Sequence, residues 1–190
     1  DSLHPAIFLL LGSLILPLLR GIWRQGLLVL LPILGFLNLL SFEAGTTWDI
    51  AFAGYQLQVL LVDKLSLLFG YLFHLAALLA AIYSLHVREG LPQLTGLMYA
   101  GSAVGAVFAG DLITLFIFWE LLALTSVFQI WARRSSTSIG SGMRYLLVHV
   151  TSGLLLLSGA ALHYQETGSL AFNHMELSGW ASWLLLLAIG

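Results

Sequence analysis

The sequence predicts an all-α, polytopic bundle of transmembrane helices, and three observations support this fold class. Hydrophobic residues make up 59% of the 190 residues and charged residues only 8%, whereas a soluble domain carries about 25% charged residues. Apolar segments recur along the chain at about the 20-residue length that a helix needs to cross a bilayer. Basic residues gather in alternate loops, as they do in multi-pass membrane proteins.

Composition also limits the functions that the chain could have. The net charge of −2 gives no reason to expect nucleic acid as a partner. The chain has no cysteine, which excludes disulfides and thiolate metal sites. It has no phosphate-binding glycine loop, no nucleophile elbow and no metal-ligand spacing. We therefore expect no cofactor and no metal, and a conduit in the lipid bilayer rather than a reaction centre.

Hydropathy predicts six complete spans and the start of a seventh. The first covers about residues 5–19 and the second about residues 22–40, in which Pro32 is expected to kink the helix. The alternating residues 50–59 predict a short hairpin outside the bilayer. The later spans are predicted at about residues 61–85, 94–109, 111–132 and 143–164, with the seventh beginning near Trp180.

Small residues recur every four positions in the fourth predicted span. Gly101, Gly105 and Ala109 form one such series. Small side chains allow neighbouring helices to approach closely in a membrane. This pattern predicts close packing around the fourth helix, without a chemical role.

The distribution of charge predicts the orientation in the membrane. Six of the seven basic residues follow the first, third and fifth spans, and Lys64 is the only basic residue on the other, acidic side. Basic loops face the cytoplasm in multi-pass proteins. We expect a protein of the cell (inner) membrane with its N-terminus outside and its basic loops in the cytoplasm. These loops hold Arg20, Arg24, Arg88, Arg133, Arg134 and Arg144.

Glu120 is the main candidate for chemistry. It lies in the apolar stretch from residue 111 to residue 132, roughly 13 Å along a helix that starts at Asp111. This places its carboxyl near the middle of a hydrocarbon core about 30 Å thick, where a carboxylate costs about 2.5–3.5 kcal/mol. Such a residue typically marks an ion or proton route. A protonated Glu120 that only hydrogen-bonds a neighbouring helix is the alternative.

Histidines supply further candidates for a proton pathway. Tyr145, His149, Ser152, Gly159 and His163 share one face of the sixth predicted helix. Histidine titrates near neutral pH, so His149 could relay protons, although a histidine packed between helices explains it equally well. For His163, near the outer end of that helix, packing is the better explanation.

Two other sets of polar residues are weaker candidates. His74 is predicted to lie about 18 Å into the third span, near the midplane, but it has no polar stripe of its own. Thr125 and Gln129 lie one turn apart beyond Glu120. They could extend a hydrated path toward the cytoplasm or bond to the helix backbone.

Two segments resemble a known family. DLITLFIFWELLALTSVFQI and RYLLVHVTSGLLLLSGAALHYQETGSL are similar to the antiporter-like membrane subunits of multisubunit sodium/proton antiporters and of respiratory complex I with its hydrogenase relatives. The shared features are a Gly-Asp turn, an aromatic-Trp-Glu motif in the next helix, and a helix that closes with a Tyr and a TGSL-like loop. HPAIFLLLGSLILPLLR and LVDKLSLLF also resemble the first and third helices of that family.

The resemblance implies a fold of about fourteen spans built as two inverted repeats of five helices. Residues 1–190 would be a single transmembrane domain, with lead-in helices over residues 1–109 and the start of the first repeat from about residue 111. The family's fifth-helix glutamate maps onto Glu120. Its partner, a lysine on the seventh helix, would lie beyond Gly190.

The resemblance also implies a function. We expect a subunit that conducts protons in a multisubunit sodium/proton antiporter, with other membrane subunits as partners and protons and Na⁺ as the ions. The TGSL-like loop favours the antiporter's D-type subunit. A proton-pumping subunit of complex I or a related hydrogenase is the alternative, in which the chain would be part of an NADH-quinone oxidoreductase without an active site of its own. A purely structural membrane subunit is the third possible function.

Overall fold

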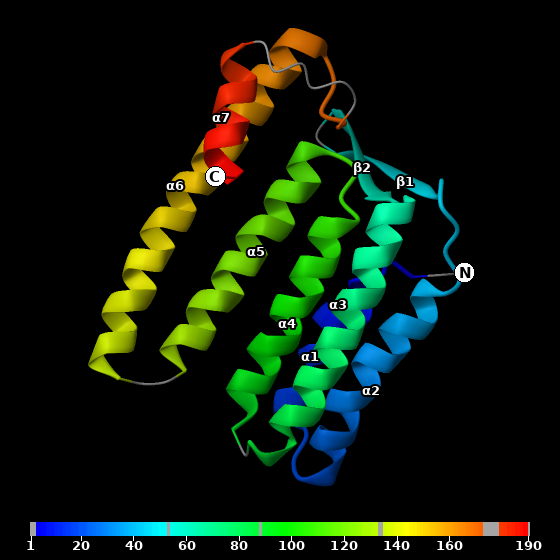
Figure 1. The fold of residues 1–190 in the computed structure, drawn as a ribbon, viewed down its shortest axis with the longest axis vertical. Coiled ribbons are helices and arrows are strands. Elements are labelled where there is room, and N and C mark those ends of the chain that lie inside the picture. The colour runs from blue at the N-terminus through cyan, green and yellow to red at the C-terminus, as the bar shows by residue number, and fades with distance from the viewer. Residues whose placement is uncertain (1–2, 53, 88, 133–134, 173–178, 190) are drawn as a thin grey trace.

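The computed structural model describes residues 3–52, 54–87, 89–132, 135–172 and 179–189. Within these ranges the fold is helical, with one two-stranded hairpin between α2 and α3, at one end of the helices (Figure 1). In chain order the elements are α1 (Ile7–Ser13), η1 (Leu16–Leu18), α2 (Ile22–Leu39), β1 (Thr47–Phe52), β2 (Tyr55–Leu61), α3 (Lys64–Tyr83), η2 (Ser84–His86), α4 (Gly90–Val107), α5 (Leu112–Trp131), α6 (Ser136–Thr167) and α7 (Trp180–Ile189).

A helix is present at each position where a span is predicted. Four of the described helical segments are long and apolar enough to cross a membrane, at Ile22–Leu39, Lys64–His86, Leu112–Trp131 and Thr137–Thr167. The first predicted span is interrupted, because its helix ends at Ser13 and a 3-10 turn follows. Pro17 has no N–H to continue the helix, which explains this break. Six complete spans and a fourteen-helix fold remain predictions.

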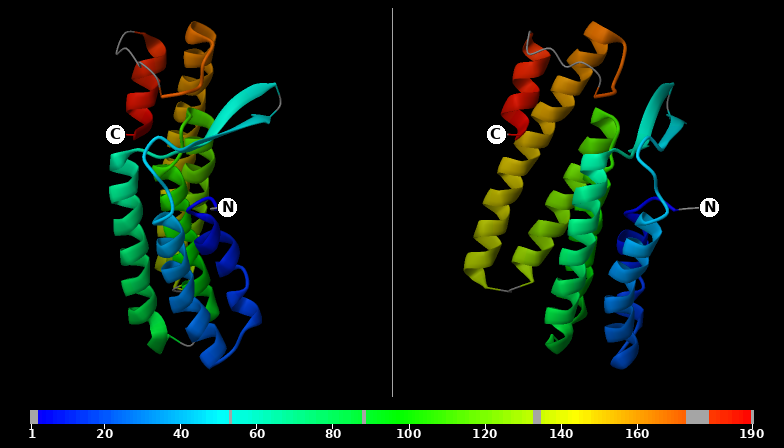
Figure 2. Two further views of the ribbon diagram at one scale, coloured as in Figure 1. Left: turned by 90° about the vertical axis from the view of Figure 1, so that its right-hand side faces the viewer. Right: turned by 45° about the vertical axis from the view of Figure 1, so that its right-hand side comes forward.

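The helices form a closed group and a row that extends from it. α1, α2, α3 and α4 pack in a ring, and α5, α6 and α7 follow α4 side by side (Figures 1 and 2). Two separate apolar cores match this division. One is built mainly from α1–α4 and the hairpin, and the other from α5, α6 and α7. α5 thus lies between the ring of α1–α4 and the pair formed by α6 and α7.

The small residues of α4 allow the close packing that the sequence predicts. A Cβ atom added at Gly101 would lie 2.9 Å from Leu10 Cγ of α1, and one added at Gly105 would collide with the Phe118 ring of α5. Real Cβ atoms do not approach other atoms so closely. Both glycines therefore let a neighbouring helix approach α4, which fixes α5 against the ring.

The predicted hairpin is confirmed and is longer than residues 50–59. Its strands pair antiparallel, and it docks on the turn between α4 and α5. Leu61 N donates to Phe108 O at 2.8 Å, and Gly110 N donates to Gln58 O at 3.0 Å. We call this end of the molecule the hairpin end.

Lys64 lies at the hairpin end, whereas the opposite end carries the described arginine residues. The connections from η1 to α2, from α3 to α4 and from α5 to α6 all lie there (Figure 1), and we call it the basic end. Arg20 and Arg24 belong to the first of these connections and to the start of α2. Arg88, Arg133 and Arg134 lie outside the described residues. The orientation of the two ends in the membrane remains a prediction.

Asp111 fixes the start of α5. Its Oδ1 accepts hydrogen bonds from Ile113 N at 2.9 Å and Thr114 N at 2.8 Å, and its Oδ2 accepts one from Thr114 Oγ1 at 2.7 Å. The side chain is only 1% exposed. It therefore satisfies helix N–H groups that water cannot reach.

We expect Asp111→Ala to lower the free energy of unfolding by about 2 kcal/mol, because the substitution leaves these buried donors without an acceptor. Asp111→Asn keeps one acceptor oxygen and should lose less. Thermal unfolding of the purified protein in detergent, followed by circular dichroism, measures both. Equal midpoints for Asp111→Ala and wild type would contradict the capping role.

Candidate functional site

Glu120 lies halfway along α5 and faces α6. Its side chain is half-buried and fills the space left by Gly153 of α6, where an added Cβ would overlap Glu120 Oε1 and lie 3.5 Å from the Phe116 ring. The sequence thus places one carboxyl group in the α5–α6 interface.

Around Glu120, three polar atoms of this interface are buried and have no hydrogen-bond partner within the described ranges. They are Glu120 Oε1, His149 Nε2 and Trp119 Nε1. Buried polar groups are nearly always paired, because an unpaired group costs about 1–3 kcal/mol. Three such atoms close together mark this part of the α5–α6 interface as a candidate site.

His149 is held by aromatic rings on both sides. The Trp119 ring of α5 stacks on it with centroids 5.6 Å apart and an interplanar angle of 26°, and Tyr145 of α6 stacks at 5.5 Å and 25°. Glu120 meets α6 at Gly153, one helical turn from His149. The structure therefore brings the first two predicted site residues together and fixes the orientation of the imidazole.

The polar stripe on α6 does not face a single neighbour. Tyr145 and His149 lie toward α5, whereas Ser152 Oγ donates to Ala188 O of α7 at 2.6 Å. Gly159 also faces α7, since a Cβ added there would lie 2.8 Å from Leu185 Cγ. Only the part of the stripe nearest the basic end joins the candidate site.

His163 lies near the hairpin end of α6 and is buried, with 6% of its surface exposed. Its backbone carbonyl accepts a hydrogen bond from Thr167 Oγ1 at 2.7 Å. Fourteen residues separate it from His149, about 21 Å along the helix. This placement agrees with the packing role expected for it.

His74 lies apart from Glu120. It is fully buried in α3, where its Nδ1 donates to Gly70 O at 2.8 Å. Its Nε2 lies against Gly35 of α2, where an added Cβ would be 2.5 Å away. α4 stands between α3 and α5 (Figures 1 and 2), so His74 is not part of the α5–α6 site.

The side chains of Thr125 and Gln129 form hydrogen bonds with different helices. Thr125 Oγ1 donates to Leu121 O and Leu122 O of its own helix, which is the backbone-bonding alternative. Gln129 Nε2 donates to Thr95 O of α4 at 3.2 Å. Neither side chain bonds to Glu120.

Trp119 and Gly153 are site residues that the sequence analysis did not single out. Trp119 immediately precedes Glu120 but reaches α6 through its large ring. Gly153 lies one helical turn after His149, on the same face. The spacing of four residues from His149 is the signal in the sequence that could have identified Gly153. Glycine has no polar side chain to mark it.

This arrangement can bind and pass a proton. A carboxyl group and an imidazole in one interface can exchange a proton directly or through a bridging water. Among the described residues, no group of three acidic, histidine or cysteine side chains converges in a way that could hold a metal ion.

Comparison with known proteins gives the class of protein first. Residues 109–190 match the family described as NADH:quinone oxidoreductase/Mrp antiporter, TM. The chain is 30% identical over 195 aligned residues to the A1-type subunit of the Na(+)/H(+) antiporter of Staphylococcus haemolyticus, covering 91% of this chain and 24% of the relative. It is 32% identical over 120 residues to the A-type subunit of the Na(+)/H(+) antiporter of Alkalihalophilus pseudofirmus, covering 59% and 15%.

Solved structures share the fold. The Mrp complex of a Dietzia species contains a chain that matches with a TM-score of 0.79 at 22% identity, covering 97% of this chain and 22% of that one. Respiratory complex I from Thermus thermophilus with bound Aureothin contains one with a TM-score of 0.77 at 24% identity, covering 97% and 43%. An archaeal membrane-bound sulfane sulfur reductase contains another, with a TM-score of 0.79 at 19% identity, covering 90% and 29%.

These comparisons confirm the resemblance to antiporter-like membrane subunits. Residues 109–190 match the membrane domain shared by NADH:quinone oxidoreductases and Mrp antiporters. Four of the described helical segments are long and apolar enough to cross a membrane. The two antiporter relatives are A-type subunits of multisubunit assemblies, and the chain spans a quarter of their length or less. The preference for a D-type subunit remains a prediction.

Proposed function

We propose that this chain is part of a proton-conducting membrane subunit of a multisubunit sodium/proton antiporter. The observation that supports this most directly is the Glu120 carboxyl in the α5–α6 interface, with an unpaired buried oxygen beside His149. The antiporter names of the relatives support sodium as the exchanged ion. Other membrane subunits would be its partners.

In the proposed mechanism Glu120 alternates between its protonated and ionised forms. A nearby ammonium stabilises the carboxylate and its removal favours the neutral acid. The resemblance assigns that ammonium to a lysine further along the seventh helix, after α7 as described here. His149 would pass the proton between Glu120 and water at the basic end.

Proton pumping in a redox-driven complex is a second candidate function. The matched family includes NADH:quinone oxidoreductase, and a chain of complex I shares the fold. The same carboxyl and imidazole would serve there, with proton movement driven by electron transfer rather than by a sodium gradient.

The deciding experiment measures proton flux in everted membrane vesicles that contain the complete parent complex. We expect added Na⁺ to drive proton movement, observed as a change in the fluorescence of a pH-sensitive dye. Flux that ignores Na⁺ but follows an added electron donor would replace the antiporter with the redox-driven function. Absence of proton flux with either Na⁺ or an electron donor would contradict both candidate functions.

His149 supplies a separate prediction. His149→Phe keeps an aromatic ring between Trp119 and Tyr145 but cannot carry a proton. We expect sodium-driven flux in the vesicles to fall about tenfold or more. His163→Phe on the same helix is the matched control and should change the flux little. Equal losses in the two variants would indicate a packing role for His149.

A further inference from the structure

The segment that precedes α1 is fastened to α2. Leu3 N donates to Asn38 Oδ1 at 3.0 Å, and Asn38 Nδ2 donates to Leu3 O at 2.7 Å. Asn38 lies one residue before the end of α2, on the side of the hairpin. This reciprocal pair of hydrogen bonds fixes the backbone immediately before His4.

The His4 ring contacts both strands of the hairpin and α5. Its Nε2 lies 3.3 Å from Val59 O of β2, and its centroid is 6.3 Å from that of Trp48 in β1. It stacks on Phe118 of α5 with centroids 5.8 Å apart and an interplanar angle of 16°. Phe118 in turn fills the space over Gly105 of α4. One imidazole thus connects the N-terminal segment, the hairpin and α5.

The hydrogen bonds of His4 require a neutral ring. Ala6 N donates to His4 Nδ1 at 3.3 Å, so Nδ1 must have a free lone pair. Val59 O can only accept, so Nε2 carries the proton. In an imidazolium both nitrogens are donors, and an Nδ1–H would face the Ala6 N–H without an acceptor between them. Protonation of His4 therefore breaks the Ala6 bond.

No charged side chain among the described residues forms a hydrogen bond or ring contact with His4. The buried and half-buried titratable groups of neighbouring elements have other neighbours: Tyr55 contacts Tyr164, Asp111 binds the first turn of α5, Glu120 lies against Gly153, and His74 lies against Gly35. The other charged groups described at the hairpin end are at exposed positions: Glu43, Asp49, Asp63, Lys64 and Glu166. A positive charge on His4 thus has no carboxylate partner among these residues.

Burial favours the neutral form of His4 as well. It lowers the pKa of the imidazole below its ordinary value of 6.5, and the hydrogen bond to Val59 O opposes this effect. A histidine in a detached segment would keep the ordinary pKa of about 6.5. The contacts of His4 are therefore fully stable above about pH 6.5, and they lose stability as the pH falls from there through the lowered pKa.

We propose that His4 is a pH-sensitive latch, which ties the N-terminal segment to the hairpin and α5 when it is neutral and releases that segment when it is protonated. Release removes the Ala6 bond and uncovers the Phe118 ring. The backbone bonds from Leu61 and Gly110 still hold the hairpin on the turn between α4 and α5, so the rest of the bundle stays folded. In the predicted orientation the hairpin end faces the outside of the cell, and the latch responds to external pH.

Hydrogen–deuterium exchange tests the latch without any measurement of transport. The complete protein that contains this chain is placed in lipid nanodiscs and exchanged at pH 8 and at pH 5, and each rate is divided by that of an unfolded peptide at the same pH. We expect the amides at the start of α1, Ala6 above all, to exchange about fivefold faster at pH 5, the effect of one hydrogen bond. The middle of α3 should not change.

Two substitutions of His4 remove the titrating group. His4→Phe keeps a ring against Trp48 and Phe118 but cannot accept from Ala6 N, so exchange should be fast at both pH values. His4→Gln has a side-chain oxygen that can accept this bond and does not titrate, so exchange should be slow at both. Either variant should lose the dependence on pH.

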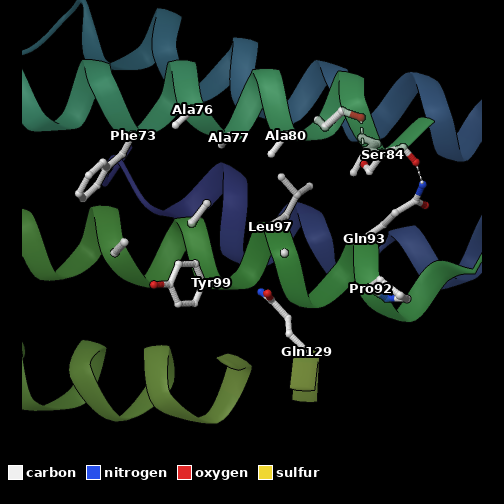
Figure 3. Close-up of a pocket in the computed structure, with 15 residues that line it drawn as sticks. Phe73, Ala76, Ala77, Ala80, Ser84, Pro92, Gln93, Leu97, Tyr99 and Gln129 are labelled. Atoms are coloured by element: carbon white, nitrogen blue, oxygen red, sulfur yellow. Dashed lines mark hydrogen bonds between the residues drawn. The ribbon is translucent and has the colours of Figure 1, made fainter. Parts of the chain in front are cut away.

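His86→Phe is the matched control. His86 is exposed in η2, where its Nδ1 lies 2.7 Å from Tyr83 O. It follows Ser84 by two residues, and Figure 3 shows Ser84 beside Gln93 of α4, at the basic end. This variant should keep the wild-type response of the α1 amides to pH.

Three outcomes would overturn the proposal. Equal protection of the α1 amides at pH 8 and pH 5 in the wild type would show that His4 releases nothing. A response that persists in His4→Phe and His4→Gln would assign it to another titrating group. Faster exchange in the middle of α3 as well would indicate general loosening in acid instead of a local latch.

Discussion

Replacing Glu120 by Gln is expected to abolish sodium-dependent proton flux in everted vesicles, a loss of about a hundredfold or to background. Glutamine has nearly the same shape and retains the contact with Gly153, but it cannot take up or release a proton. The complex should still assemble, because the packing of α5 against α6 is unchanged. Dye-reported flux and the amount of intact complex on a native gel measure the two effects.

Glu166→Gln is the matched control for this loss. Glu166 is an exposed carboxylate on α6, near the hairpin end, so its neutralisation should leave flux unchanged. If Glu120→Gln transports at the wild-type rate, Glu120 is not on the proton path. If the complex fails to assemble, Glu120 has the structural role of a buried hydrogen-bonding group instead.

Gly153→Ala should damage the same site from the opposite helix. The added Cβ would overlap Glu120 Oε1, so the carboxyl must move or the two helices must separate. Overpacking of this kind costs about 1–3 kcal/mol. We expect flux to fall about tenfold and the midpoint of thermal unfolding to drop.

Gly140→Ala, at the basic end of the same helix, separates the collision from a general effect of alanine. An added Cβ would lie 4.0 Å from Arg144 Nη2, which is an ordinary contact distance. Alanine also has a higher helix propensity than glycine. This control should transport normally and be as stable as wild type or more so. Normal flux in Gly153→Ala would mean that the position of the Glu120 carboxyl is not critical.

The sequence predicted the helical architecture well, because long apolar segments and the turns between them are local signals. The alternation over residues 50–59 predicted the hairpin but not its ends. The strands extend to Thr47 and Leu61, which pair with each other across the hairpin and are not part of the alternating stretch. The break after Ser13 was also missed. Hydropathy does not reveal it, because a window average over leucine and isoleucine residues stays high when it includes one proline.

The candidate site was predicted in part. Glu120 is conspicuous because a carboxylate in an apolar helix is costly, and His149 because histidine can carry a proton. Their proximity depends on the rotation of α5 against α6, which the sequence of either helix alone does not determine. That rotation depends on Gly153 and on the Trp119 ring, and it also places Ser152 against α7 instead of in the site.

The backbone contacts at the hairpin end also affect how the site can move. Besides the two hydrogen bonds to the hairpin, Leu112 N donates to Leu170 O at 3.0 Å, so the first turn of α5 is fastened on two sides. Gln129 fastens the last part of α5 to α4. Both ends of α5 are therefore tied to neighbouring elements, and Glu120 lies between these ties, about 12 Å along the helix from Leu112. A shift of its carboxyl by about 1 Å is enough to make or break a hydrogen bond with a neighbour on α6.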